Sequence, residues 1–406
     1  MHVLMVEPAF PRNQREFARA LHQIGARVTG IGERPLEALD GELRGWLDRY
    51  EQVSSVVDEQ ALHAAVRRCQ AREWVDRLEA TIEAHVSAAA NVRHACTIPG
   101  TSPQTAFLCR DKPAMKEALR EAGVACAQSR GVQRPEEVHE FVREVGLPII
   151  LKPRDAAGAS GAIKVSRAEE LEGAIARAGI DRGRSSAVEE FIEGHEGFYD
   201  TLSVGGEIRY EFISHYYPNV LEAMRERWIS PCWLTTNRLD APGYAEVREM
   251  GRRVIAALGI GTSATHMEWF FGPKGLKFSE IGCRPPGVGA WDVYGAANEF
   301  DLYVEWARAV CGLPPGQRPS RRYSGGMIAL RPSQDGRISG YEGLDPLQQR
   351  YGGWIVDTHL PPVGTPTQPV EAGYMANAWI RMRHPDYDEL RAMLDFVGRN
   401  VRVWAH

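Results

Sequence analysis

The chain has 406 residues, a length that predicts two or three domains. Its 48 basic and 53 acidic residues leave a net charge of −5, which is too small and of the wrong sign for an electrostatic nucleic-acid-binding protein. Hydrophobic residues make up 44% of the sequence, and no run is long and apolar enough for a membrane span. This composition is typical of an ordinary globular enzyme.

The cysteines and the first residues indicate the compartment. Seven cysteines are scattered along the chain without a CxxC pair, which supports neither a disulfide framework nor a zinc site. The opening residues, MHVLMVEPAF, lack a basic leader and a long apolar run, so they do not resemble a signal peptide. We therefore expect a cytoplasmic protein with reduced thiols.

The N-terminal region begins with a βαβ pattern. The apolar run at residues 2–6 predicts a buried strand, a helix with apolar positions at helical spacing ends at Gly25, and residues 28–31 predict a second strand. This order predicts a small Rossmann-like domain with a parallel sheet over residues 1–100. The turn after the first strand has no GxGxxG, which argues against a dinucleotide site.

The rest of the chain predicts a two-part domain and a small C-terminal domain, so the expected fold class is mixed α/β and α+β. Strands, hairpins and helices alternate over residues 101–312, with subdomains at 101–185 and 186–312, and turn-rich PPGQRPS marks the end of this region. Residues 313–406 are expected to form short strands and a final helix. The predicted helices of the middle region span residues 112–122, 135–145, 243–258 and 299–310.

Two glutamates in the segment HMEWFFGPKGLKFSEIG are the strongest candidates for a metal site. A three-residue hairpin loop ending at Gly275 would pair Phe270 with Phe278 and Glu268 with Glu280, all on one half-buried face. Two facing carboxylates repel each other, so a cation is expected between them, and Mg²⁺ or Mn²⁺ suits oxygen ligands. The alternative is a shifted register, in which one glutamate faces solvent and pairs with a lysine.

A glycine-rich segment and two lysines are candidate phosphate ligands. RDAAGASGA, residues 154–162, lies between two predicted strands, so it is not a Walker loop, but a small-residue hairpin can offer backbone N–H groups to phosphates. Lys152 ends an apolar strand and Lys112 begins a helix, where each ammonium could reach a site. The alternatives are a hairpin tip without a ligand and ordinary surface lysines.

Arg284 and His266 flank the glutamate pair in the sequence. Arg284 follows Glu280 by four residues, and its planar guanidinium suits a carboxylate or phosphoryl oxygen; the alternative is a salt bridge to a loop carboxylate. His266 lies two residues before Glu268, on the same expected strand face. It would line the site or serve a purely structural role.

The stretch SHYYPNVLEAMRERWISPCW, residues 214–233, is rich in aromatic and arginine side chains. Long loops on a rigid scaffold often carry specificity, which makes His215, Tyr217 and Arg227 candidate substrate contacts. Ordinary loop packing is the alternative.

Taken in order, four segments resemble the ATP-grasp superfamily, and in particular its carboxylate–amine ligases of the L-amino acid or peptide type. DKPAMKEALREAGV resembles the first helix of that fold, and LPIILKPRDAAGASG resembles the strand and glycine loop over the triphosphate. AVEEFIEGHEGFYD resembles the hinge strand around adenine and ribose, and HMEWFF…FSEIGCRPPG resembles the metal-binding hairpin. The resemblance covers about residues 100–310.

The resemblance implies a role for each matching residue. Lys112 and Lys152 would hold the ATP phosphates, and Gly158, Ser160 and Gly161 would cover the triphosphate. Glu189 and the backbone of Ile192 would contact adenine, and Glu196 would bind the ribose hydroxyls. Glu268 and Glu280 would bind magnesium, and Arg284, with Lys152, would act in catalysis by contacting the carboxylate or acyl phosphate. Gly282 departs from the family, which usually has an asparagine metal ligand at that position.

The expected function is an ATP- and magnesium-dependent ligase that joins a small-molecule carboxylate to an amine through an acyl phosphate. The expected substrates are amino acids or a peptide, with no nucleic-acid or membrane partner, and a homodimer through the C-terminal segment stays open. Three alternatives remain: activation of bicarbonate, as in carboxylase-type relatives, a non-catalytic ATP-binding protein, motivated by Gly282, and direct phosphotransfer to a small molecule.

Overall fold

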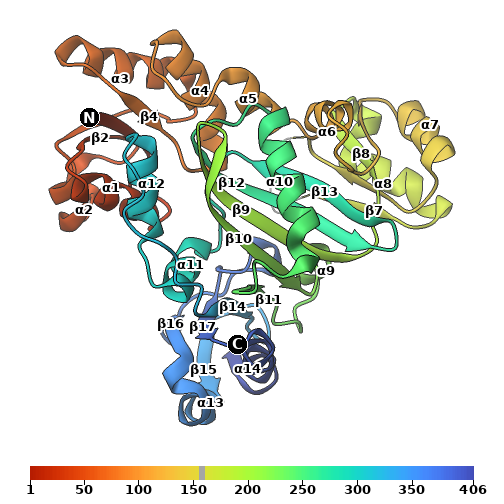
Figure 1. Cartoon of the computed structure of the whole chain (residues 1–406). Helices are drawn as coiled ribbons and strands as arrows, with labels where there is room; N and C mark the ends of the chain where they lie inside the picture. Colours follow the sequence, from red (N-terminus) through yellow and green to blue (C-terminus); the bar gives the residue numbers. More distant parts are fainter. Residues whose placement is uncertain (155–160) are drawn as a thin grey trace.

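A computed structural model describes residues 1–154 and 161–406, and one large antiparallel sheet runs through the middle of the molecule (Figure 1). A parallel sheet from the N-terminal region and a small antiparallel sheet from the following segment lie at its two sides (Figure 1). None of the helices in the described ranges is both long and apolar enough to pass through a bilayer. The mixed α/β and α+β fold class predicted from the sequence is confirmed.

The N-terminal region is a parallel sheet with helices around it. Its elements are β1 (His2–Val6), α1 (Gln14–Gln23), β2 (Arg27–Gly32), α2 (Gly41–Trp46), β3 (Arg49–Gln52), α3 (Glu59–Arg72), β4 (Arg77–Glu79), α4 (Val86–Ala95) and α5 (Pro103–Leu108). The strand order is β3-β2-β1-β4, so the carboxyl ends of β1 and β4 lie side by side. Every residue of β1 is buried, as expected of a strand covered on both faces.

Aromatic packing attaches this N-terminal sheet to the rest of the molecule. The amphipathic helix α1 buries Phe17, whose ring lies 4.8–5.1 Å from the rings of Trp291, Tyr303 and Trp306. These rings belong to α11 (Ala290–Asn298) and α12 (Leu302–Val310). Since aromatic side chains bury large apolar areas, this contact holds the N-terminal sheet firmly against the central region.

The following segment forms the small antiparallel sheet. Its elements are α6 (Lys112–Glu121), β5 (Ser129–Val132), α7 (Pro135–Val145), β6 (Ile149–Lys152), β7 (Ile163–Val165), α8 (Leu171–Ala178) and β8 (Ser186–Glu190), with strand order β5-β8-β6-β7. Ile149 and Leu151 pack with apolar residues of α7 and α8. Because successive side chains of a strand alternate between faces, Ile150 and Lys152 point to the other face.

The central sheet contains the longest strands. Its region comprises β9 (His195–Val204), β10 (Glu207–Tyr217), α9 (Val220–Ala223), β11 (Cys232–Thr235), α10 (Ala245–Ala257), β12 (Ser263–Gly272) and β13 (Gly275–Gly282). The hairpin between β9 and β10 turns at Gly205 and Gly206, both with positive φ, as predicted. Helix α10 packs with buried residues of β12 and β13.

The C-terminal segment extends the same sheet. Its elements are β14 (Ser324–Leu330), β15 (Ile338–Glu342), α13 (Leu344–Tyr351), β16 (Ile355–His359), β17 (Ala378–His384), α14 (Tyr387–Asn400) and β18 (Arg402–Ala405). Strand β14 pairs with β11, which gives the full order β13-β12-β9-β10-β11-β14-β17-β16. The strands expected of a separate small domain are therefore hydrogen-bonded into the central sheet, and the domain limits stay predictions.

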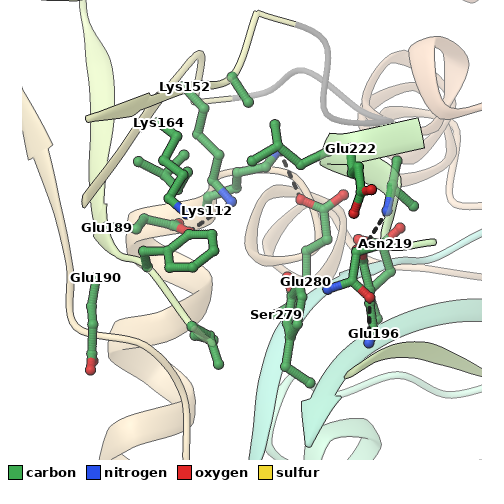
Figure 2. A pocket seen from close by; sticks show the side chains of 18 of the residues that line it. Lys112, Lys152, Lys164, Glu189, Glu190, Glu196, Asn219, Glu222, Ser279 and Glu280 are labelled. Atoms are coloured by element: carbon green, nitrogen blue, oxygen red, sulfur yellow. Dashed lines mark hydrogen bonds and ion pairs between the residues drawn. The ribbon is translucent and has the colours of Figure 1, made fainter. Parts of the chain in front are cut away.

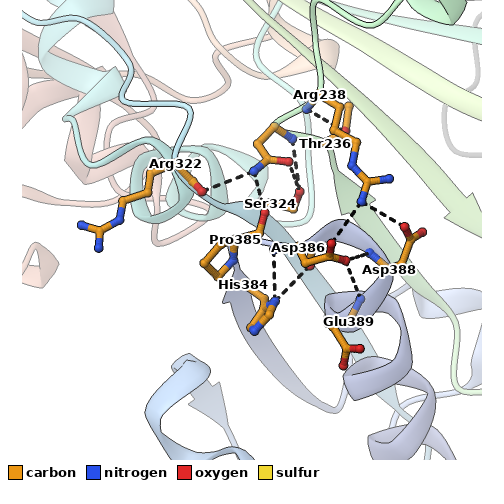
Figure 3. Close-up of polar contacts among 10 residues, drawn as sticks. Thr236, Arg238, Arg322, Ser324, His384, Pro385, Asp386, Asp388 and Glu389 are labelled. Atoms are coloured by element: carbon orange, nitrogen blue, oxygen red, sulfur yellow. Dashed lines mark hydrogen bonds and ion pairs between the residues drawn. The ribbon is translucent and has the colours of Figure 1, made fainter.

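A polar cluster fastens the last helix to the central region (Figure 3). Ser324 donates a hydrogen bond to Asn237, and the Asn237 amide donates to the carbonyl of Pro385 at 2.8 Å. Next to it, Arg238 forms an ion pair with Asp388 at 2.9 Å (Figure 3). These contacts connect the loop after β11 to the start of α14, so the C-terminal segment is held at both β14 and α14.

Candidate functional site

A cavity of about 410 Å³ lies between the small antiparallel sheet and one end of the central sheet (Figure 2). Its volume is in the range of small-molecule sites, roughly 300–1,000 Å³. Charged side chains from both sheets line it, together with an apolar part formed by residues such as Phe191 and Leu221. Among the residues that the structure describes, seven of the sequence-predicted ones line this cavity: Lys112, Lys152, Glu189, Ile192, Glu196, Glu268 and Glu280.

The β12–β13 hairpin brings Glu268 and Glu280 directly opposite each other, as the sequence predicted. The predicted loop and the aromatic pairing were wrong, however. Gly272 pairs with Gly275 across a two-residue turn, and Phe278 pairs with Trp269 in the core on the opposite face. A register shift after Glu268 restores the glutamate pairing.

Ser279 is the additional residue at this register shift, and it lines the cavity together with Glu280. A β-bulge lets adjacent residues of one strand face a single partner, and bulges are frequent beside active sites. The bulge therefore explains why Glu268 and Glu280 both face the cavity, whereas Phe270 faces the cavity and Phe278 faces the core.

Lys112 stands at the start of α6, where a local network sets its position. Asp111 caps the helix by accepting from the backbone N–H of Ala114 and also binds the Arg154 guanidinium at 2.8 and 2.9 Å. This pairing ties the helix start to the chain just after β6. Lys112 Nζ lies 3.4 Å from the carboxylate of Glu280 (Figure 2), so helix and hairpin meet at the cavity.

Glu189 is held between two lysines. Its Oε2 atom lies 2.6 Å from Nζ of Lys116 and 2.7 Å from Nζ of Lys152, and Lys116 is only 1% exposed. Burial alone would raise the pKa of Glu189, but the two ammonium groups lower it to about 2. Burial, opposed by Glu189, lowers the pKa of Lys116 to about 8. This carboxylate therefore orients Lys152 at the edge of the cavity.

Glu196 sits on the other side of the cavity, at the start of β9 (Figure 2). The backbone N–H of Val220 donates to its Oε2 atom at 2.7 Å, and Asn219 accepts from the backbone N–H of Glu196 at 3.0 Å. Burial and the charge of Glu268 raise the pKa of Glu196 to about 8. The carboxylates of Glu196, Glu268 and Glu280 therefore repel one another on this side of the cavity.

This donor set fits a divalent cation. Glu268 and Glu280 offer carboxylate oxygens, the ligands that Mg²⁺ and Mn²⁺ prefer. Burial is the main cause of the raised pKa of Glu196, and the negative charges of Glu268 and Glu280 add to it; a cation would offset those charges. Within residues 1–154 and 161–406, no group of three or more His, Cys, Asp or Glu side chains is arranged to hold a metal alone. Other oxygen ligands, such as phosphates, would have to complete the coordination.

A small recess adjoins the cavity and shares Lys112 and Glu280 with it. Arg284 and His266 line this recess, as does Glu83 from the N-terminal region. Arg284 Nε donates to Glu83 Oε2 at 2.8 Å, so the predicted arginine has a carboxylate partner in the chain itself. The recess therefore lies where the N-terminal sheet meets the cavity.

His266 occupies the strand face expected for it, on β12 beside Glu268. Its Nδ1 atom lies 2.7 Å from Asp200, and its Nε2 atom lies 3.7 Å from Glu268. Asp200 also accepts a hydrogen bond from Tyr294 at 2.5 Å. Burial would lower the pKa of His266, but Asp200 and Glu268 raise it to about 9.

The remaining predicted residues lie elsewhere or cannot be placed. His215 is hydrogen-bonded to His195 and Tyr244, Tyr217 contacts the Tyr387 hydroxyl at 3.1 Å, and Arg227 forms an ion pair with Asp335 at 2.5 Å. None of these three lines the cavity or the recess, and a role in substrate contact stays a prediction for them. Gly161 has the positive φ of a turn residue, while Gly158 and Ser160 lie outside the described residues.

Lys116, Asn219 and Glu83 were not predicted from the sequence. Lys116 follows Lys112 by four residues on one helix, so the shared helical face was a usable signal. Asn219 lies within residues 214–233, where the sequence predicted substrate contacts, but its contact with Glu196 depends on a turn without a recognisable sequence pattern. No local pattern indicated Glu83, because its partner Arg284 lies 201 residues away.

Comparison with known proteins identifies the domain that contains the cavity. Residues 117–300 match the model of the ATP-grasp domain. The formate-dependent phosphoribosylglycinamide formyltransferase of Anaeromyxobacter dehalogenans is 28% identical over 306 residues, which cover 74% of this chain and 75% of that protein. The L-arginine-specific L-amino acid ligase of Bacillus subtilis is 26% identical over 250 residues, which cover 60% of each.

Solved structures agree in fold. The L-amino acid ligase from Bacillus licheniformis superposes with a TM-score of 0.78 over 100% of this chain and 98% of that chain, at 17% identity. The N5-carboxyaminoimidazole ribonucleotide synthetase from Thermotoga maritima gives a TM-score of 0.71 at 16% identity over 100% of this chain and 99% of that one. Residues 117–300 are therefore an ATP-grasp domain, and the whole chain has the fold of these solved ligase structures.

Proposed function

We propose that this chain activates a small carboxylic acid as an acyl phosphate at the expense of ATP and joins it to an amine as an amide. The single observation that carries the proposal is the pairing of Glu268 with Glu280 on the face of a nucleotide-sized cavity that also contains Lys112 and Lys152. Paired carboxylates beside lysines suit a metal-bound triphosphate. The relatives named above are ligases and transferases acting on formate or amino acids, which supports the same chemistry.

Different residues around the cavity would bind different parts of the nucleotide. Lys112 and Lys152 would hold the phosphates, and Glu196 would bind the ribose hydroxyls. The backbone near Ile192 and the apolar side chains beside it would enclose the adenine. Glu189 contacts two lysines through its carboxylate, which favours a role in orienting Lys152 over direct contact with adenine. Mg²⁺ or Mn²⁺ held by Glu268 and Glu280 would neutralise charge on the phosphates when bound.

The proposed reaction has two steps. An oxygen of the substrate carboxylate attacks the γ-phosphorus, and ADP leaves with the electron pair of the broken P–O bond. The amine nitrogen then attacks the acyl carbon, the C–O bond to phosphate breaks, and the amine loses a proton. Lys152 lines the cavity, Arg284 lines the recess, and Glu280 borders both; the two cations would stabilise the charge on the transferred group and on the carboxylate.

The test is a phosphate-release assay with Glu280→Gln. Glutamine keeps the size of the side chain but loses the charge, so ATP-, carboxylate- and amine-dependent phosphate release should fall by about a thousandfold or more. Glu207→Gln, an exposed change on β10, is the matched control and should keep full activity. Thermal unfolding should show that both variants are folded.

Turnover of Glu280→Gln close to that of the wild type would refute the metal assignment. A screen of amino acids, singly and in pairs, identifies the substrates with the same assay. A stable phosphorylated product without any amine requirement would favour direct phosphotransfer, and stimulation by bicarbonate would favour a carboxylase-type reaction. ATP binding without turnover under all conditions would leave a non-catalytic role.

A further inference from the structure

Two buried cysteines lie in contact beside the recess. Cys109 follows α5 and lines the recess, and Cys283 follows β13, between Gly282 and Arg284. The Cys109 thiol donates a hydrogen bond to the sulfur of Cys283, and both side chains belong to one packed group in which they are 3% and 5% exposed. The contact therefore joins the end of α5 to the glutamate hairpin through two thiols.

Polar groups surround the sulfur of Cys283. This atom lies 3.2 Å from Ser263 Oγ and 3.9 Å from Thr101 Oγ1. The hydrogen bond from Cys109 lowers the pKa of Cys283 most strongly, against the effect of burial. Ser263, Thr101 and the guanidinium of Arg93 lower this pKa further. Such surroundings favour the thiolate, which is the reactive form of a cysteine.

The residue that follows each cysteine holds the same N-terminal segment. Arg284 Nε donates to Glu83 Oε2 at 2.8 Å, and Arg110 donates to the backbone carbonyl of Glu83. A displacement of Cys109 or Cys283 is therefore passed directly to an arginine of the recess.

We propose that Cys109 and Cys283 are a modification site at which a small peroxide forms a disulfide bond, and that this bond slows the reaction at Arg284. The bond draws the two sulfur atoms to about 2.05 Å, which is much closer than two thiols approach in a hydrogen bond. The chain at Arg284 shifts as a result. The effect on the reaction rests on the proposed function, whereas the disulfide itself does not.

The chemistry requires one thiolate, one thiol and one hydroperoxide. The thiolate attacks a peroxide oxygen, the O–O bond breaks, and hydroxide leaves and takes up the proton that the thiolate had lost. The second thiol then attacks the sulfur of the resulting sulfenic acid, the S–O bond breaks, and a second water leaves with the proton of that thiol. The two cysteines lose two electrons, which the peroxide accepts, and a dithiol reductant reverses the change.

The size of the recess selects the oxidant. Its free volume is about 20 Å³, enough for one water-sized molecule, which needs roughly 10–15 Å³. Hydrogen peroxide, with only two heavy atoms, is close to this size, whereas glutathione disulfide is far larger. We therefore expect hydrogen peroxide to oxidise the pair and glutathione disulfide to leave it reduced.

The test treats the reduced full-length protein with hydrogen peroxide, blocks the remaining thiols, and digests the chain without reductant. Mass spectrometry should find the peptide of Cys109 linked to the peptide of Cys283, lighter than their sum by two hydrogen atoms. Phosphate release in the presence of ATP, Mg²⁺, acid and amine should fall at least about tenfold, because a displacement of about 1 Å in an active site can cost more than that. Dithiothreitol should restore it.

Three variants serve as controls, each compared with its own untreated sample. Cys109→Ala and Cys283→Ala each remove one half of the pair, so neither should show a loss of phosphate release that dithiothreitol reverses. Cys69→Ala should respond like the wild type. Cys69 is also buried, with 4% exposed, but burial raises the pKa of its thiol to about 11.

The outcomes separate this inference from the proposed function. Absence of the linked peptide in peroxide-treated wild type would overturn the inference, even if a cysteine variant fails to fold. A reversible loss of phosphate release in Cys109→Ala as large as in the wild type would also overturn it, because another site would then be oxidised. A linked peptide with unchanged phosphate release would overturn the effect on Arg284. Untreated protein that releases phosphate with no acid would contradict the proposed function, while a linked peptide would still support the modification site.

Discussion

The nucleotide cavity and the recess beside it are built in different ways. Most of the cavity comes from residues 117–300, with Lys152 and Glu189 on one side and Glu196, Glu268 and Glu280 on the other, and Lys112 joins them from the start of α6. The recess depends on Glu83, which arrives from a separate sheet, and on a glycine that leaves room for it. We therefore expect phosphoryl transfer to depend mainly on the cavity, and access to Arg284 to depend on the contact between the two regions.

Substitution of the two lysines that contact Glu189 should have the largest effect, and it tests the roles of residues in the cavity. Lys152→Met should lower kcat/KM for ATP by at least about a hundredfold, because Lys152 is placed to meet the phosphates. Lys116→Met should mainly lower the free energy of unfolding, by about 1–3 kcal/mol, since a buried carboxylate loses one of its partners. Phosphate release and urea unfolding measure the two effects.

The exposed Lys274 provides the control for both lysine variants, and Lys274→Met should change neither quantity appreciably. If Lys116→Met and Lys152→Met lose activity to the same extent without loss of stability, Lys116 contacts the nucleotide itself, and the division of roles around Glu189 is wrong.

Gly282→Asn tests the recess side and should have a smaller effect. The new side chain would displace the Glu83–Arg284 ion pair, so the KM of the carboxylate substrate should rise about tenfold while the KM of ATP stays nearly constant. The double variant with Glu83→Ala should lose less stability than the sum of the single changes, because the asparagine then has room. Steady-state kinetics and thermal unfolding provide the measurements.

Gly261→Asn is a matched control, since a Cβ atom at position 261 would meet nothing within 4 Å. An equal rise in the KM of ATP in Gly282→Asn would show that the recess and the cavity are not separable, which would break the comparison between them.

A change of His215 should have the smallest effect on activity, because this residue lines neither the cavity nor the recess. Burial and the neighbouring His195 lower the pKa of His215 to about 3, from an ordinary value of 6.5. Between these values the unfolded chain binds more protons than the folded one, so stability is full above pH 6.5 and falls as the pH drops towards 3. The contribution of one such proton is at most about 1.4 kcal/mol per pH unit.

His215→Phe should therefore make the pH dependence of the unfolding free energy flatter between pH 6.5 and pH 4, as measured by urea unfolding. Tyr244→Phe removes a hydrogen bond of His215 but keeps its imidazole, and it should keep the wild-type slope. If His215→Phe changes the KM of one substrate but not of others, His215 contacts that substrate, although it does not line the cavity or the recess.

Much of the cavity could be predicted because its signals are local. The alternation of a strand places Lys152 opposite to Leu151, and a short turn brings Glu268 and Glu280 together. The details of that hairpin could not be predicted, since the bulge at Ser279 moves Phe278 to the other face. A pairing register depends on the neighbouring strand and on core packing, which a single hairpin sequence does not contain.

The sequence by itself indicated the fold class, the ATP-grasp domain and several charged residues of the cavity, such as Lys152, Glu268 and Glu280, because these follow from short periodic patterns and ordered motifs. Only the tertiary structure decided that Glu83 faces Arg284, that Lys116 joins Lys152 at Glu189, and that the C-terminal strands continue the central sheet. These contacts join segments far apart in the chain. Their geometry is set by the packing of whole sheets and helices, so no local pattern records it.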